Sequence, residues 1–76
     1  MTLSTLVNIL DAAEIAHIDY YSANELWMVA VDGAFEARQV SDEPDKLALT
    51  STWPNPPLSK VVDDPAAALV AVAAFI

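Results

Sequence analysis

The stretch "ELWMVAVDGAFEARQV", residues 25–40, decides the fold that we expect for this chain. Two runs rich in aromatic and β-branched residues flank Asp32 and Gly33, and Asp-Gly between apolar runs is a strong signal for a β-hairpin with a type I′ turn. Gly33 is the only glycine of the chain, which fits a turn position that requires a positive φ. The sequence therefore predicts strands over residues 25–31 and 34–40.

A two-residue loop at Asp32–Gly33 fixes the expected register of this hairpin and assigns every side chain to a face. In that register one face carries an entirely apolar set that we expect in the core: Leu26, Met28, Ala30, Phe35 and Ala37. The other face is mixed, and we expect it to lie away from the core: Trp27, Val29, Val31, Glu36 and Arg38.

A third strand is expected over residues 46–53, where Leu47, Leu49 and Trp53 alternate with smaller or polar residues. Prolines follow at once, and proline cannot donate to a sheet. We therefore expect residues 54–62 to form an extended, proline-stiffened connection. The segment "WPNPP" also has the composition of a ligand for an aromatic groove, but a fixed connection that packs over Trp53 is the favoured interpretation.

Helical spacing of apolar residues marks the N-terminal segment, and it predicts one helix over residues 3–18 that is capped by Thr2 or Ser4. The spacing is carried by Leu3, Leu6, Val7, Leu10, Ala13 and His17. The segment "DAAE" (Asp11–Glu14) resembles a capping box, so the alternative is a second helix that starts at Ala12; the favoured interpretation is one helix with a kink near Asp11.

The C-terminal segment "DDPAAALVAVAAFI" begins as a helix should, with Asp64 at the N-cap and Pro65 at the first helical position. The residues expected to face the core are Leu69, Val72, Ala73 and Ile76. Together these segments predict a single α+β domain over residues 1–76. It is expected to be a three-stranded antiparallel β-meander packed with an N-terminal and a C-terminal helix.

The composition of the chain excludes more classes of function than any sequence motif does. The chain has 76 residues and a net charge of −8, with only three basic residues, so direct binding to nucleic acid or to an anionic membrane is not expected. It has no cysteine, and we identify no targeting segment and no stretch long enough to span a bilayer. We expect a cytoplasmic protein whose acidic surface favours a basic partner.

Few side chains could support catalysis. His17 is the only histidine, and Asp19 could orient it as a general base, but a histidine at a helix end is more often structural. The single glycine leaves no phosphate-binding loop, and the acidic loop of Asp42, Glu43 and Asp45 lacks the framework of an EF-hand. We therefore predict no enzyme activity, no catalytic or metal-binding residues and no cofactor.

The remaining hypothesis is binding to another protein. Small size and acidity are typical of phage anti-defence inhibitors and nucleic-acid mimics, so we expect a stoichiometric inhibitor or adaptor on a basic surface of a larger nucleic-acid-handling protein. The alternative is a structural subunit that forms a homodimer or larger homo-oligomer through the C-terminal helix and the sheet face of Trp27. The residues expected to bind a partner are Trp27, Glu36, Arg38, Asp42, Glu43, Asp45, Asp11 and Glu14.

Overall fold

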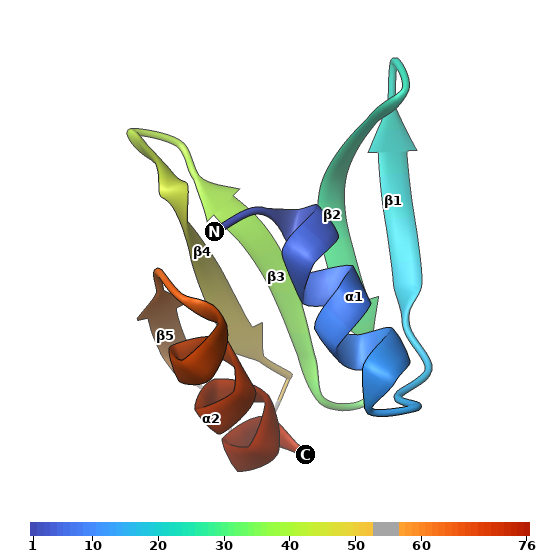
Figure 1. The fold of residues 1–76 in the computed structure, drawn as a ribbon, viewed down its shortest axis with the longest axis vertical. Helices are drawn as coiled ribbons and strands as arrows, with labels where there is room; N and C mark the ends of the chain where they lie inside the picture. Colours follow the sequence, from blue (N-terminus) through green and yellow to red (C-terminus); the bar gives the residue numbers. More distant parts are fainter. Residues whose placement is uncertain (53–56) are drawn as a thin grey trace.

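The computed structural model describes residues 1–52 and 57–76 and shows an α+β fold in two layers, with both helices on one face of an antiparallel sheet (Figure 1). The elements are α1 (Leu3–Ala12), β1 (Ile18–Ser22), β2 (Glu25–Val31), β3 (Phe35–Val40), β4 (Glu43–Ser51), β5 (Ser59–Val62) and α2 (Pro65–Phe75). The strands pair in chain order to form a five-stranded sheet. The predicted three-stranded meander is therefore wrong, because β1 and β5 extend the sheet at its two edges.

The hairpin of β2 and β3 has a different turn from the predicted one, and its register differs by one residue. Val31 pairs with Phe35, which leaves a three-residue loop over residues 32–34. Gly33 has a φ of 73°, whereas Asp32 does not have a positive φ, and Ala34 donates its N–H to the carbonyl of Val31. A positive φ only at the third position is the pattern of a type II turn, not of type I′.

This shift of one residue exchanges the two faces of β2. Val29 and Val31 lie in the core beside Phe35 and Ala37, whereas Met28 and Ala30 belong to the other face. The prediction that Phe35 and Ala37 are core residues is confirmed. Met28 is buried, as predicted, but on the face away from the helices, and the predicted positions of Ala30 in the core and of Val29 and Val31 outside it are wrong.

Helix α1 is shorter than predicted because the chain turns out of the helix at Glu14. Glu14 has a φ of 58°, its N–H binds the carbonyl of Asp11, and the N–H of Ile15 binds the carbonyl of Leu10. These two hydrogen bonds make a Schellman motif, which ends a helix and satisfies its last carbonyls. The predicted N-cap at Thr2 is confirmed, since its side chain accepts from the N–H of Thr5.

The edge strand β1 begins at Ile18, the last residue of the predicted helix, and continues to Ser22. A two-residue turn at Ala23–Asn24 connects β1 to β2, and both residues have positive φ (51° and 67°), as a type I′ turn requires. The type I′ hairpin therefore lies one strand earlier in the chain than the sequence predicts.

The other edge strand, β5, forms within the predicted proline-stiffened connection. Its residues pair with β4, where Leu47 faces Val62 and Leu49 faces Lys60. The predicted core positions of Leu47 and Leu49 are confirmed. Trp53 and most of "WPNPP" lie outside the described residues.

Helix α2 begins as predicted but presents another face to the core. Asp64 accepts from the N–H of Ala67 at 2.7 Å, and Pro65 occupies the first turn. The buried residues of the helix are Ala68, Ala71 and Val72, with Phe75 packed beside Phe35, so the predicted core positions of Leu69, Ala73 and Ile76 are wrong. The core between the sheet and the helices consists of Leu3, Leu6, Leu10, Val29, Val31, Phe35, Ala37, Leu47, Leu49, Val62, Ala68, Ala71 and Val72.

The left-handed backbone at Glu14 predicts a stabilising substitution. Glu14→Gly should raise the free energy of unfolding by about 0.5–1 kcal/mol, because glycine adopts a positive φ without the steric cost of a side chain. Urea denaturation followed by circular dichroism measures the change. Glu14→Ala is the matched control: it removes the same charge but keeps the strain, so an equal gain from alanine would assign the effect to charge at the helix end instead.

Candidate functional site

The sheet face opposite the helices, which we call the open face, has no helix or strand over it among the described residues (Figure 1). Cross-strand pairing identifies its members, because directly paired residues share a face. One row runs through Ile18, Ala30, Glu36, Thr50 and Ser59, and another through Arg38, Ala48 and Val61. Ile18 and Val61 keep 52% and 57% of their surface exposed, so the open face presents apolar side chains to solvent.

A β-bulge places Trp27 on the open face. Tyr20 pairs with Met28 and Tyr21 with Leu26, so Trp27 is the extra residue between two paired positions. A bulge of this kind turns two neighbouring side chains toward one side of a sheet. The indole of Trp27 lies 5.9 Å from the ring of Tyr20 and 5.5 Å from the guanidinium carbon of Arg38, measured to ring centroids.

Arg38 is held in place by three neighbours. Its Nε donates to the sulfur of Met28 at 3.3 Å, its terminal nitrogen lies 3.6 Å from a carboxylate oxygen of Glu36, and its plane stacks near Trp27. Its side chain is still 58% exposed. Beside it lies an open hollow of about 290 Å³ that is lined by Glu36, Arg38, Ala48 and Thr50.

The acidic residues are concentrated toward one end of the sheet. In an antiparallel meander the β1–β2 turn, the β3–β4 turn and the end of β5 lie at the same end of their strands, and Figure 1 shows the two turns at the top of the view, on opposite sides of the sheet. Exposed carboxylates at this acidic end belong to Glu25, Asp42, Glu43, Asp45, Asp63 and Asp64. Lys46 is the basic side chain among them, and it lies 3.4 Å from Glu43.

The predicted partner-binding residues therefore fall into three groups. Trp27, Glu36 and Arg38 lie together on the open face. The acidic residues 42–45 follow β3, and Glu43 pairs with Val40, two residues along that strand from Arg38. Asp11 and Glu14 lie at the C-terminal end of α1, on the helix side of the molecule and away from the open face.

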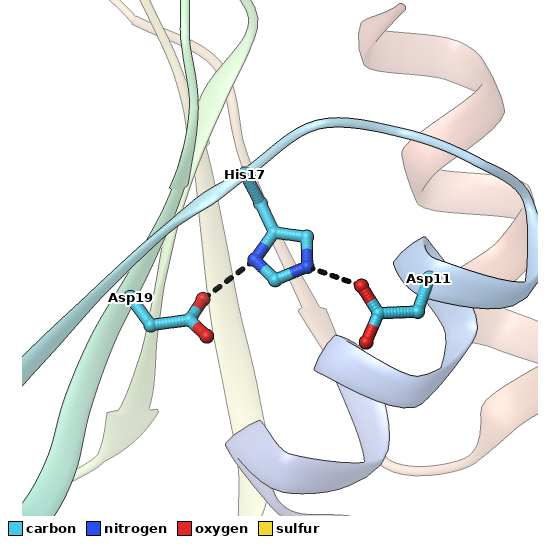
Figure 2. A network of polar contacts seen from close by, with 3 residues as sticks. All are labelled: Asp11, His17 and Asp19. Atoms are coloured by element: carbon cyan, nitrogen blue, oxygen red, sulfur yellow. Dashed lines mark hydrogen bonds and ion pairs between the residues drawn. The ribbon is translucent and has the colours of Figure 1, made fainter.

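Asp11 instead belongs to a polar cluster around His17, the second candidate site. His17 lies in the segment between α1 and β1, with Asp11 on the helix and Asp19 on the strand (Figure 2). Nε2 of the ring is 2.7 Å from a carboxylate oxygen of Asp11, and Nδ1 is 2.6 Å from one of Asp19. The side chain of His17 is only 11% exposed.

This geometry favours a protonated imidazole. Both ring nitrogens face carboxylate oxygens, which only accept hydrogen bonds when ionised, so both nitrogens must donate. The pKa of His17 is raised above its ordinary value, chiefly by the hydrogen bond to Asp11 and to a smaller extent by Asp19, while burial of the ring acts in the opposite direction. With both nitrogens engaged, this ring has no free lone pair with which to remove a proton from a substrate.

Sequence reasoning missed several residues of the open face, because they lie on strands that it did not predict or on the wrong side of β2. They are Ile18, Tyr20, Met28 and Val61. Ala48 and Thr50 lie on a strand that was predicted, on the side away from Leu47 and Leu49, as expected. The signal for β1 was present: isoleucine and tyrosine favour strands, and Asn24 tolerates the positive φ of a hairpin turn.

Comparison of the chain with protein-family models, curated proteins and solved structures found no match. Within residues 1–52 and 57–76 no helix has the length and hydropathy of a membrane span. The same residues contain no group of three or more acidic, histidine or cysteine side chains arranged to hold a metal ion. The functional argument therefore rests on the geometry of the open face and the charge around it.

The cluster around His17 predicts a pH-dependent stability. Because the pKa of His17 is raised on folding from about 6.5, the stabilisation is complete below that pH and is lost as the pH rises through the higher folded value. The free energy of unfolding of the wild type should therefore exceed that of His17→Gln most at pH 6, and the difference should shrink toward pH 9. Urea denaturation at both pH values measures it.

Variants of the two carboxylates are the matched controls. Asp19→Asn should cost about 1–2 kcal/mol at pH 6, because it removes a hydrogen bond between charged groups. Asp11→Asn should cost less, since the Asp11 side chain is 64% exposed and solvent screens it. A proton NMR titration that placed the His17 pKa at or below 6.5 would contradict the proposed protonation.

Proposed function

We propose that this chain is a non-catalytic protein-binding domain that contacts its partner through the open face. The observation that carries the proposal is Trp27, whose indole lies beside the tilted ring of Tyr20 and the guanidinium of Arg38 and is still 44% exposed. A half-exposed tryptophan costs solvation free energy in the free protein, and a partner that covers it recovers that free energy.

The three side chains have the chemistry of a binding hot spot. Tryptophan, tyrosine and arginine are the residue types most enriched among those that contribute most to protein–protein affinity. Here Arg38 is already fixed by Glu36, Met28 and Trp27, so little conformational entropy is lost when a partner binds. A preorganised arginine beside an aromatic pair supports binding more directly than a mobile surface arginine would.

The charges around the open face indicate what kind of partner fits. The acidic residues 42–45 follow the strand that carries Arg38, and the whole chain carries a net charge of −8. A partner with an apolar spot bordered by lysine or arginine would match both features, and the acidic field would accelerate its encounter. The phosphate-binding surface of a nucleic-acid-handling protein is the class of basic surface that we favour.

The cluster around His17 supports binding over catalysis. It ties α1 to β1 through two hydrogen bonds and leaves neither ring nitrogen available. We therefore assign His17 a structural role that holds the edge strand β1, and with it Tyr20, in position beside Trp27.

Site-specific photo-crosslinking in the native cells tests the proposal. A photoreactive phenylalanine analogue in place of Tyr20 should capture a partner, and the additional substitution Trp27→Ala should reduce capture by tenfold or more, because hot-spot truncations cost about 2 kcal/mol or more. The adduct should also diminish as salt is raised, since screening weakens attraction between opposite charges.

The same analogue in place of Asn8, which is exposed on α1, is the matched control. Capture from position 8 alone would place the contact surface on the helices and overturn the proposal. Capture from position 20 that is unaffected by Trp27→Ala would also overturn it.

A further inference from the structure

The outer side of α2 is an apolar surface that nothing in the described part of the chain covers. Its exposed residues are Ala66, Leu69, Val70, Ala73, Ala74 and Ile76. The three large ones keep 52%, 68% and 65% of their surface exposed, in the order Leu69, Val70 and Ile76. These residues recur at intervals of three and four, so they form one continuous stripe along the helix.

The packing of α2 only partly follows what burial favours, because two alanines face the core with Val72 and Phe75 while larger residues face solvent. The helix turns the small residues Ala68 and Ala71 inward, where they let it approach α1 and the sheet closely, and it turns Leu69 and Val70 outward. Burying a leucine or valine side chain stabilises the folded state, so leaving both in water gives up a substantial stabilisation. A second surface that covers the stripe would recover this stabilisation.

The charges near α2 indicate what that surface is. No residue of α2 is charged, and acidic side chains stand only before its N-terminal end, at Asp63 and Asp64. Near its C-terminal end, Lys60 lies 6.0 Å from the ring of Phe75. Among the described residues, Lys60 is the one lysine or arginine without a carboxylate within 4 Å.

We propose that a second copy of this chain covers the stripe, with the two α2 helices packed antiparallel about a twofold axis near Val70. Antiparallel packing sets the N-terminal end of each helix beside the C-terminal end of the other. It therefore brings Asp63 of each copy toward Lys60 of the other. The same pair of charges occurs twice in the dimer, as a twofold-symmetric interface requires. The uncharged stripe lets the copies meet without placing carboxylates against one another.

Two other occupants fit less well. A partner with a basic surface would find no carboxylate along the stripe, whereas the acidic end of the sheet offers several. A lipid surface usually binds helices with lysine and arginine beside the apolar side, and here aspartates and a net charge of −8 oppose an anionic headgroup. One eleven-residue helix per copy offers less area than a permanent dimer buries, so the dimer should be reversible.

The dimer would make the proposed binding domain bivalent. The stripe lies on the helical layer and Trp27 on the opposite side of the sheet, so dimerisation leaves both open faces free. The inference does not rest on the proposed function: the dimer would stand even if the open face bound nothing.

A charge-swap experiment tests the arrangement. Sedimentation velocity over a range of concentrations should show a monomer–dimer equilibrium for the wild type. K60E alone and D63K alone should each weaken dimerisation tenfold or more, because each homodimer then brings like charges together twice. An equimolar mixture of the two variants should restore the dimer, since every contact between a K60E chain and a D63K chain is attractive.

Val70→Asp should abolish the dimer, and Val61→Asp is its matched control, because Val61 is similarly exposed but lies on the open face. Thermal denaturation establishes that both variants fold, and Trp27→Ala should leave the dimer intact. A wild type that stays monomeric at millimolar concentration would overturn the proposal, as would a mixture that does not re-form the dimer. Sedimentation of the wild type with neutral lipid vesicles, lost in Val70→Asp, would assign the stripe to a membrane instead.

Discussion

The pairing of Val31 with Phe35 across the β2–β3 turn is the constraint on which the two sides of this protein depend. Gly33 takes a positive φ of 73°, and the loop closes with one residue more than a type I′ turn has. In this register Val29 and Val31 join Phe35 in the core under the helices. The other face of β2 then falls on the side that no helix of the described residues covers, and a change of one residue would exchange the two sets.

The bulge at Trp27 gives the open face its chemistry. Without it, strict alternation would send Trp27 to the same side as Val29, under the helices. The extra residue instead leaves Trp27 and Met28 on one side, where the indole stacks near Arg38 and the sulfur accepts from it. Bulges reorient side chains next to functional sites in many sheets, and here one assembles the cluster that we propose as a hot spot.

Features that depend on neighbouring residues, such as helix caps, could be predicted from the sequence, whereas the pairing of strands could not. Thr2 and Asp64–Pro65 marked the helix starts correctly, because caps depend on a few neighbouring atoms. The edge strands could not be predicted in the same way, since β1 exists only because β2 lies beside it. The face of α2 was also unreadable, because a helix made entirely of apolar residues has no polar side that marks the core. Trp27, Glu36 and Arg38 were correctly placed on one face, but Tyr20 lies on a strand that was missed and Met28 had been assigned to the other face of β2.

Charge distinguishes the partner that we propose for the open face from the one that we propose for the apolar stripe of α2. Copies of a chain with a net charge of −8 repel one another at long range, so random association through the open face and its acidic border is disfavoured. A basic partner is attracted to that same border. On α2 the carboxylates are confined to one end and Lys60 lies near the other, so only an antiparallel copy aligns opposite charges across the stripe. A small domain whose helices cover one side of its sheet can in this way expose two apolar surfaces and still discriminate between a copy of itself and a different protein.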